Sequence, residues 1–146
     1  MRNAYRRRRV QTPPKYNNFK PSGVPRKLLS IITLTVDEYE AIRLADYEGM
    51  QHQEASEEMH ISRPTFTRLI DKAHQKISIA LTEGKELIIE GGNVDFDFNL
   101  YRCHDCGDLN QTDADELITA CPDCGSVNLE DYAGHHRMRF GKKHHP

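Results

Sequence analysis

The sequence predicts a mainly α domain built around a helix-turn-helix, followed by a small β module held together by cysteines. Two observations predict the helical domain. Apolar residues recur at the spacing of two short helices that bury one shared seam, and a polar break separates them. A third observation predicts the β module, because two CxxC pairs follow a stretch in which apolar and polar residues alternate. The seam consists of Ala55, Met59, Ile61, Phe66 and Leu69.

Composition limits the class of protein. The chain has 146 residues, a hydrophobic fraction of 37% and a mean hydropathy of -0.73. No run of 18 apolar residues is present and no apolar segment follows the N-terminal arginines, so we expect a cytoplasmic protein without a membrane span. The net charge of -2 conceals a segregation, because nine Lys or Arg and no acid precede Asp37. The slightly negative net charge therefore does not argue against a polyanionic partner.

Residues 1–30 should form a basic, largely extended arm without a core of its own, since they hold four prolines and few apolar side chains. We expect its arginines to follow DNA phosphates or a minor groove beside a bound helix. The alternative is a disordered tail that only improves solubility. The arginines in question are Arg6, Arg7, Arg8 and Arg9.

Residues 31–84 should form the helical domain. Thr35 and Glu38 match a capping box, so a first helix should span about 36–48. Gly49 favours a left-handed stop after it. A second helix should follow over 51–59.

The third helix should be the longest. Ser62 is a good N-cap and Pro64 suits the first turn, so this helix begins near Arg63 and continues to about Thr82, before Gly84. Its far half could pack on the first helix or on a second subunit, and the sequence leaves a homodimer open. The predicted apolar stripe is Phe66, Leu69, Ile70, Ala73, Ile77, Ala80 and Leu81.

The outward face of this third helix carries short polar and basic side chains. Thr65, Thr67, Arg68, Asp71 and Lys72 project outward and Arg63 lies on the flank, and the short polar and basic side chains on the first two turns suit reading of the major groove. The alternative is a helical hairpin whose charged face touches only water.

The β module should cover 85–131. One strand is predicted over 85–89 and, after a Gly91-Gly92 loop, another over 94–100, where apolar and polar residues alternate. The remaining residues, 132–146, form a basic tail with four histidines, His135, His136, His144 and His145. Paired histidines could hold a second metal, but most surface histidines bind none.

All four cysteines of the chain lie in two CxxC pairs separated by fourteen residues. Each pair presents two thiolates to one ion, so together they complete the tetrahedral shell of one structural Zn²⁺. Iron is an alternative metal, and disulfides are disfavoured in a cytosolic chain. The ligands are Cys103, Cys106, Cys121 and Cys124.

Four segments carry a family resemblance: FKPSGVP at 19–25, LTVDEYEAIRLADYEG at 34–49, EASEEMHISRPTFTR at 54–68 and GKELIIEGG ending at residue 92. Here the chain resembles an uncharacterised prokaryotic family of predicted DNA-binding proteins. The helix-turn-helix of that family is similar to region four of bacterial sigma factors, and the four-cysteine module looks like a zinc ribbon. By this resemblance the residues that touch DNA are Ser62, Arg63, Pro64, Thr67 and Arg68.

Two positions depart from that pattern. His60 stands at the corner, where such motifs usually carry Gly, so a non-Gly residue must take a less favourable conformation or the corner must change shape. Thr67 also stands where the resemblance implies Gly, which would direct a side chain towards the DNA groove.

These features favour a DNA-binding protein, a transcriptional regulator that reads duplex DNA through the third helix. One alternative is an adaptor that docks on RNA polymerase or another protein. Another is a sensor whose four-cysteine site responds to metal or oxidant. We expect no enzyme, because the chain has no Gly-rich phosphate loop and no convincing pair of nucleophile and base.

Overall fold

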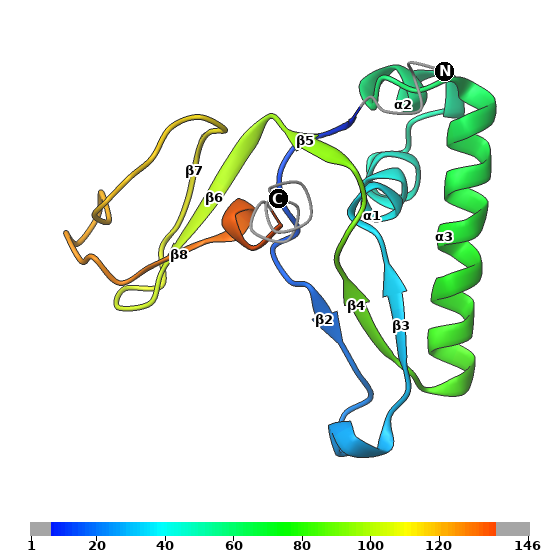
Figure 1. Cartoon of the computed structure of the whole chain (residues 1–146), viewed down its shortest axis with the longest axis horizontal. Helices are drawn as coiled ribbons and strands as arrows, with labels where there is room; N and C mark the ends of the chain where they lie inside the picture. The colour runs from blue at the N-terminus through cyan, green and yellow to red at the C-terminus, as the bar shows by residue number, and fades with distance from the viewer. Residues whose placement is uncertain (1–6, 137–146) are drawn as a thin grey trace, which may run out of the picture. The chain divides into compact units, whose positions relative to one another are not determined.

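The computed structural model of the chain describes residues 7–136. The chain divides into two compact units (Figure 1). The first contains the N-terminal segment as far as Val10 and then Tyr16–Asp95, and the second contains Gln11–Lys15 and the chain from Phe96 onward. The predicted boundary after residue 84 therefore falls inside the first unit. It was misplaced because the strand that follows residue 84 pairs with strands from the beginning of the chain.

The first unit contains a three-stranded sheet in addition to its helices. The strands are β2 (Asn18–Phe19), β3 (Ile31–Leu34) and β4 (Glu86–Ile89), in the order β2-β4-β3. Strand β4 runs antiparallel to β2 and parallel to β3. The unit is therefore mixed α/β, whereas the sequence predicted a mainly α domain. The sheet joins segments more than fifty residues apart, which local periodicity does not reveal.

Helix α2 (His52–Glu58) begins and ends close to its predicted limits. Helix α1 (Val36–Ile42) begins where predicted but ends earlier, and the chain continues as a π-helix, η3 (Arg43–Tyr47), close to the predicted end at 48. The predicted capping box is present at Thr35 and Glu38. Helix α3 (Arg63–Glu83) begins after Ser62, whose Oγ accepts a hydrogen bond from the Thr65 N–H, and ends at a left-handed Gly84. These signals were predictable because each depends on residues at most one turn apart.

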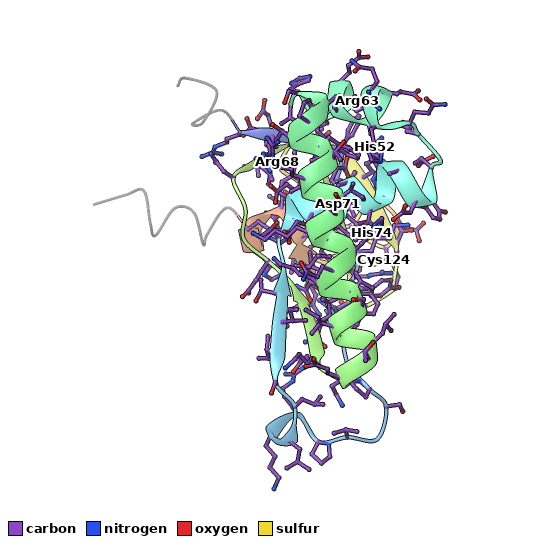
Figure 2. The ribbon with its side chains drawn as sticks, turned by 90° about the vertical axis from the view of Figure 1, so that its right-hand side faces the viewer. His52, Arg63, Arg68, Asp71, His74 and Cys124 are labelled. Atoms are coloured by element: carbon purple, nitrogen blue, oxygen red, sulfur yellow. The ribbon has the colours of Figure 1, made fainter. Side chains whose placement is uncertain are left out.

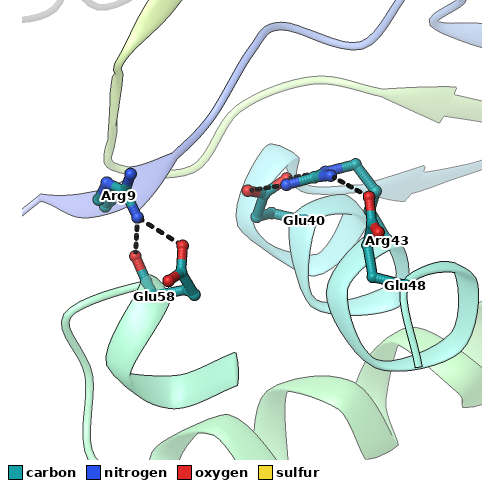
Figure 3. Close-up of polar contacts among 5 residues, drawn as sticks. All are labelled: Arg9, Glu40, Arg43, Glu48 and Glu58. Atoms are coloured by element: carbon teal, nitrogen blue, oxygen red, sulfur yellow. Dashed lines mark hydrogen bonds and ion pairs between the residues drawn. The ribbon is translucent and has the colours of Figure 1, made fainter. Parts of the chain in front are cut away.

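An ion-pair network fixes the junction of α1 and η3 (Figure 3). Arg43 donates from Nε and Nη2 to the two carboxylate oxygens of Glu40, at 2.8 and 2.9 Å, and from Nη1 to Glu48 at 3.1 Å. The hydrogen bond to Glu40, which is almost fully buried, outweighs desolvation and raises the pKa of Arg43. The charge of this guanidinium thus belongs to the fold and is not available to a partner.

The helices bury the predicted seam in one core. Leu81 is the exception within the predicted stripe, because its side chain is 79% exposed. It lies five full turns beyond Arg63 and thus on the same exposed flank of α3. The core residues are Ala41, Leu44, Ala55, Met59, Phe66, Leu69 and Ile70, with Ile61 packed against them.

The N-terminal segment does not form an arm without a core, at least from residue 7 onward. Strand β1 (Arg8–Val10) pairs with β5 (Val94–Phe96), β2 joins the sheet, and η2 (Arg26–Leu28) is a short 3₁₀-helix. Val10 is fully buried. The prediction failed because these strands are too short to show a periodic pattern.

The second unit holds β6 (Phe98–Cys103), β7 (Leu109–Asp113) and β8 (Leu129–Asp131), antiparallel in the order β7-β6-β8. The single strand predicted over 94–100 is thus two strands, β5 and β6, that belong to different sheets. Asn99 breaks the alternation. It is fully buried, and its side chain binds Asp131 and the N–H of Ala133.

None of the helices between residues 7 and 136 combines the length and the apolar character that a membrane crossing requires.

Candidate nucleic-acid interface and metal centre

The corner between α2 and α3 depends on one residue in an unusual conformation. His60 has a φ of 58° and is the only non-glycine residue among residues 7–136 with a positive φ. The N–H groups of His60 and Ile61 donate to the carbonyls of Glu57 and Ser56, at 3.2 and 3.0 Å. The expectation of a non-Gly residue in a less favourable conformation is thus correct, and the chain turns tightly there without glycine.

The start of α3 carries cations that are not used by the fold. Arg63, Arg68 and Lys72 are exposed, and within residues 7–136 none of them has an ion-pair or hydrogen-bond partner. Most other cations of the first unit contact a carboxylate. Arg63, Arg68 and Lys72 therefore differ from them in being free to contact a ligand. The ion-paired residues are Arg7, Arg8, Arg9, Arg26, Arg43, Lys76 and Lys85.

The side chains predicted to face outward divide between two sides of α3. In Figure 2, Arg68 lies on one side of the helix while His52 and His74 lie on the other. Thr67 belongs with the histidines, because its Oγ1 is 2.9 Å from His52 Nδ1 and it is only partly exposed. The ring of His52 also contacts Phe66 edge-on, at 5.2 Å between centroids. Thr67 therefore helps to join α2 to α3.

The other predicted contacts at the start of α3 lie around its first turn. Ser62 and Pro64 are exposed, and Thr65 is partly exposed. The hydroxyl of Ser62 serves as the N-cap and also donates to Thr65 Oγ1, at 2.8 Å. Ser62 and Thr65 thus have a structural role in addition to any contact with a ligand.

The arginines predicted to follow phosphates are bound to the first unit. Arg7 pairs with Asp95 at 3.2 Å and Arg8 with Asp37 at 2.7 Å. Arg9 pairs with Glu58 at 2.8 Å (Figure 3). Arg6 lies outside the described residues. Three of the four guanidiniums therefore pair with a carboxylate, and their contact with DNA phosphates stays a prediction.

The four cysteines come together at one point of the second unit. All four Sγ atoms lie within 4.8 Å of one another, with Cys103 3.6 Å from Cys124 and Cys106 3.7 Å from Cys121. In a tetrahedral site with Zn–S bonds of about 2.3 Å, neighbouring sulfurs are about 3.8 Å apart. A disulfide would require about 2.05 Å. The sulfur atoms are therefore spaced for one metal ion, which this cluster could hold.

Two of these sulfur atoms accept hydrogen bonds from backbone N–H groups. The N–H of Cys106 points at Cys103 Sγ at 3.5 Å, and the N–H of Asp123 points at Cys121 Sγ at 3.4 Å. The hydrogen bond from Cys106 outweighs burial and lowers the pKa of Cys103 to about 7. The pKa values of Cys106 and Cys124 are raised instead, so Cys103 is the one of these three that forms a thiolate, the form that binds a metal, most readily.

Two histidines of the second unit contact Glu130, a residue that the sequence did not single out. Glu130 accepts one contact from His104 at 3.2 Å and another from His135 at 3.1 Å. His136 is buried and its ring lies 5.6 Å from that of Phe96. His144 and His145 lie outside the described residues. Within the described part, the four cysteines are the group that could hold a metal.

The chain is similar to proteins whose function is not known. It is 52% identical over 124 residues to a UPF0251 protein of Chloroherpeton thalassium, covering 85% of this chain and 82% of the relative. It is 47% identical over 100 residues to one of Pelotomaculum thermopropionicum, covering 68% and 76%. A UPF0251 protein of Halothermothrix orenii is 36% identical over 136 residues, covering 93% and 86%. No solved structure matches the chain.

A family model agrees with these relatives. It matches residues 1–97, which include the whole helical part of the first unit and both strands at its end. The chain therefore belongs to the family described as protein of unknown function DUF134.

Proposed function

We propose that the protein binds duplex DNA and acts as a transcriptional regulator, with α2 and α3 as its helix-turn-helix. The observation that carries this proposal is the distribution of charge on the first unit. Most other cations of the first unit contact carboxylates, while Arg63, Arg68 and Lys72 cluster on the first turns of α3 and are exposed and unpaired among the described residues. Unpaired cations at the start of the second helix of such a motif are what a groove-reading helix requires.

The two arginines would have separable roles. A bidentate arginine to guanine contributes about 1–3 kcal/mol to discrimination at one base pair, whereas a phosphate contact strengthens binding to every sequence alike. Arg63 leaves the first turn of α3, where a recognition helix enters the major groove. Arg68 lies on the opposite side of α3 from His52, and its role is the subject of the next subsection.

The proposal includes one zinc ion in the second unit. Four thiolates with this spacing form a complete shell that leaves no position for a substrate, so the metal would stabilise the fold and take no part in a reaction. Its ligands would be Cys103, Cys106, Cys121 and Cys124.

Selection of bound sites from random duplexes at physiological salt tests the proposal. A defined motif should emerge, and a two-fold symmetric motif would indicate a homodimer. Arg63→Ala should lose preference at one position of that motif. Lys27→Ala is the matched control, because Lys27 is an exposed cation in η2, far along the first unit from α2 (Figure 1). If Arg63→Ala, Arg68→Ala and Lys27→Ala all bind the selected site as tightly as the parent protein, α3 does not read DNA.

An adaptor function is a second candidate, favoured by apolar side chains on the four-cysteine unit. Leu117 and Val127 are 75% and 81% exposed, although both are large hydrophobic residues. Such residues suit contact with a protein such as RNA polymerase. Retention of polymerase by the parent protein, lost with Leu117→Ser and Val127→Ser and combined with weak binding to all duplexes, would favour the adaptor over the regulator.

A further inference from the structure

A groove of about 500 Å³ opens beside the first turns of α3 in the first unit. Its walls come from four segments of the chain. Helix α3 provides two cations, β1 provides a third, and the start of α1 together with the loop before β5 provides the remaining wall. The residues that the argument uses are Arg8, Asp37, Glu38, Arg68, Lys72 and Gly92.

The two carboxylates in this groove have their acceptor capacity largely filled. Asp37 accepts from Arg8 Nη1 at 2.7 Å, and its other oxygen contacts the hydroxyl of Thr35. Glu38 Oε1 accepts from the Thr35 N–H and from Lys76 Nζ, both at 2.8 Å. Both carboxyl groups are buried and each is paired with a cation. The groove therefore offers little that would attract a second cation.

The donors of the groove, in contrast, are largely unused. Arg68 and Lys72 lie one turn apart on α3, so their side chains emerge next to each other. Neither has a partner within residues 7–136, and Arg8 uses only one of its five N–H donors there, on Asp37. Two unpaired cations, together with the spare donors of Arg8, whose charge Asp37 balances, thus face one open volume.

Close packing fixes the wall opposite α3. The N–H of Val36 donates to the carbonyl of Gly91 at 3.0 Å, which holds the loop before β5 against the start of α1. Gly92 has a φ of 94°, and a Cβ atom built on it would lie 2.8 Å from Asp37 Oδ1. A larger residue would displace Asp37 and, with it, Arg8. The cations therefore converge on a preformed groove.

We propose that this groove binds a phosphate group. The unpaired Arg68 and Lys72, with the spare donors of Arg8 beside them, suit a tetrahedral phosphate, whose oxygens can accept from donors on two elements at once, better than a planar carboxylate. The phosphate could belong to the DNA backbone or to a free phosphorylated small molecule, which would then compete with DNA for Arg68 and Lys72. In the first case the inference rests on the proposed function, and Arg68 positions the duplex instead of reading a base.

Titration of the ¹⁵N-labelled full-length protein with inorganic phosphate, at an ionic strength kept constant with chloride, tests the proposal. Saturable amide shifts should appear at residues 65–72 and 91–93. Lys72→Gln should weaken phosphate binding by about tenfold or more, because it removes a charge-assisted hydrogen bond. Lys72→Arg should retain binding, and Lys27→Gln should behave as the parent protein. Shifts that grow linearly, spread along the chain or persist in Lys72→Gln would overturn the proposal.

A second titration, with a duplex, separates the two sources of phosphate and the two proposals. If the duplex displaces inorganic phosphate and Lys72→Gln lowers the slope of log K against log salt by about one, the site holds a backbone phosphate. If phosphate binds saturably but does not compete with the duplex, the ligand is a small molecule. Phosphate binding without any duplex binding rejects the proposed function and retains the groove. Duplex binding with no saturable phosphate site rejects the phosphate groove and retains the proposed function.

Discussion

The guanidinium of Arg9 donates two hydrogen bonds to Glu58, the last residue of α2, one to its carbonyl oxygen at 2.9 Å and one to its Oε1 at 2.8 Å (Figure 3). The Arg9 N–H also donates to the carbonyl of Met59, at 3.1 Å. These bonds satisfy carbonyls that the end of a helix leaves unpaired, at the pole where a positive charge is favourable. Arg9 therefore acts as a cap for α2.

Replacement of Arg9 should lower stability more than it lowers DNA affinity. We expect Arg9→Ala to reduce the free energy of unfolding by about 1 kcal/mol, since the pair is partly exposed and solvent screens it. Urea denaturation of the parent protein, Arg9→Ala and Lys27→Ala measures the effect. Equal midpoints for all three proteins would show that the contacts with Glu58 contribute nothing.

Removal of residues 2–6 should weaken DNA binding without a change of preferred sequence. This deletion eliminates Arg2 and Arg6 but keeps the ion pairs of Arg7, Arg8 and Arg9. Two cations near phosphates release counterions and read no bases, so the slope of log K against log salt should fall by at most about two. An altered binding motif would contradict this prediction.

The corner between α2 and α3 should become more stable when His60 is replaced by glycine. A non-glycine residue at a φ of 58° carries a conformational cost of about 1 kcal/mol, which glycine avoids. His60→Gly should therefore raise the melting temperature. Gly84→Ala is the matched control at a φ of 70° and should lower it. A lower melting temperature for His60→Gly would mean that the imidazole makes a stabilising contact that outweighs the strain.

Loss of one thiolate should release the metal and affect mainly the second unit. Elemental analysis of the untagged protein should give one zinc per chain, and Cys121→Ser should give none. Structural zinc contributes on the order of 10 kcal/mol to the folding of small modules, so the amides of β6, β7 and β8 should lose their dispersion in a ¹H–¹⁵N spectrum while those of α1 and α3 keep theirs. A parent protein with neither zinc nor iron would contradict the prediction.

Alkaline pH should destabilise the first unit through Tyr39. Burial, followed by the charge of Glu40, raises the pKa of Tyr39 above its ordinary value of 10.0, so the fold favours the neutral phenol. This contribution is complete below the unfolded pKa and disappears as the pH rises through the folded pKa. The difference in unfolding free energy between the parent protein and Tyr39→Phe should be constant below about pH 9 and should shift in favour of Tyr39→Phe above about pH 10. A constant difference throughout would exclude the effect.

The features that the sequence predicted well are those that depend on neighbouring residues. The capping box at Thr35, the N-cap at Ser62 and the stop at Gly84 each involve residues within one or two turns, and periodicity identified the core around Phe66. The spacing of the two CxxC pairs likewise predicted that the four cysteines come together. Each of these signals is local.

The features that sequence reasoning missed all require long-range contacts. Strand β4 pairs with β3 and β2, and Arg8 forms an ion pair with Asp37. No sequence pattern around either member of these pairs indicates its partner. Asn99 looked like an outward polar residue, yet it is buried because Asp131 and Ala133 satisfy its side chain. The groove beside α3 was missed for the same reason, since its walls meet only after folding.

The interleaving of the two units affects the order in which the protein can fold during synthesis. Gln11 belongs to the second unit, where its carbonyl accepts a hydrogen bond from the N–H of Phe98 at 2.9 Å. Roughly 90 residues separate the two, so at about 5–20 residues per second Gln11 leaves the ribosome roughly 5–20 s before its partner. The first unit can therefore fold completely while residues 11–15, which belong to the second unit, wait for the remainder of the nascent chain.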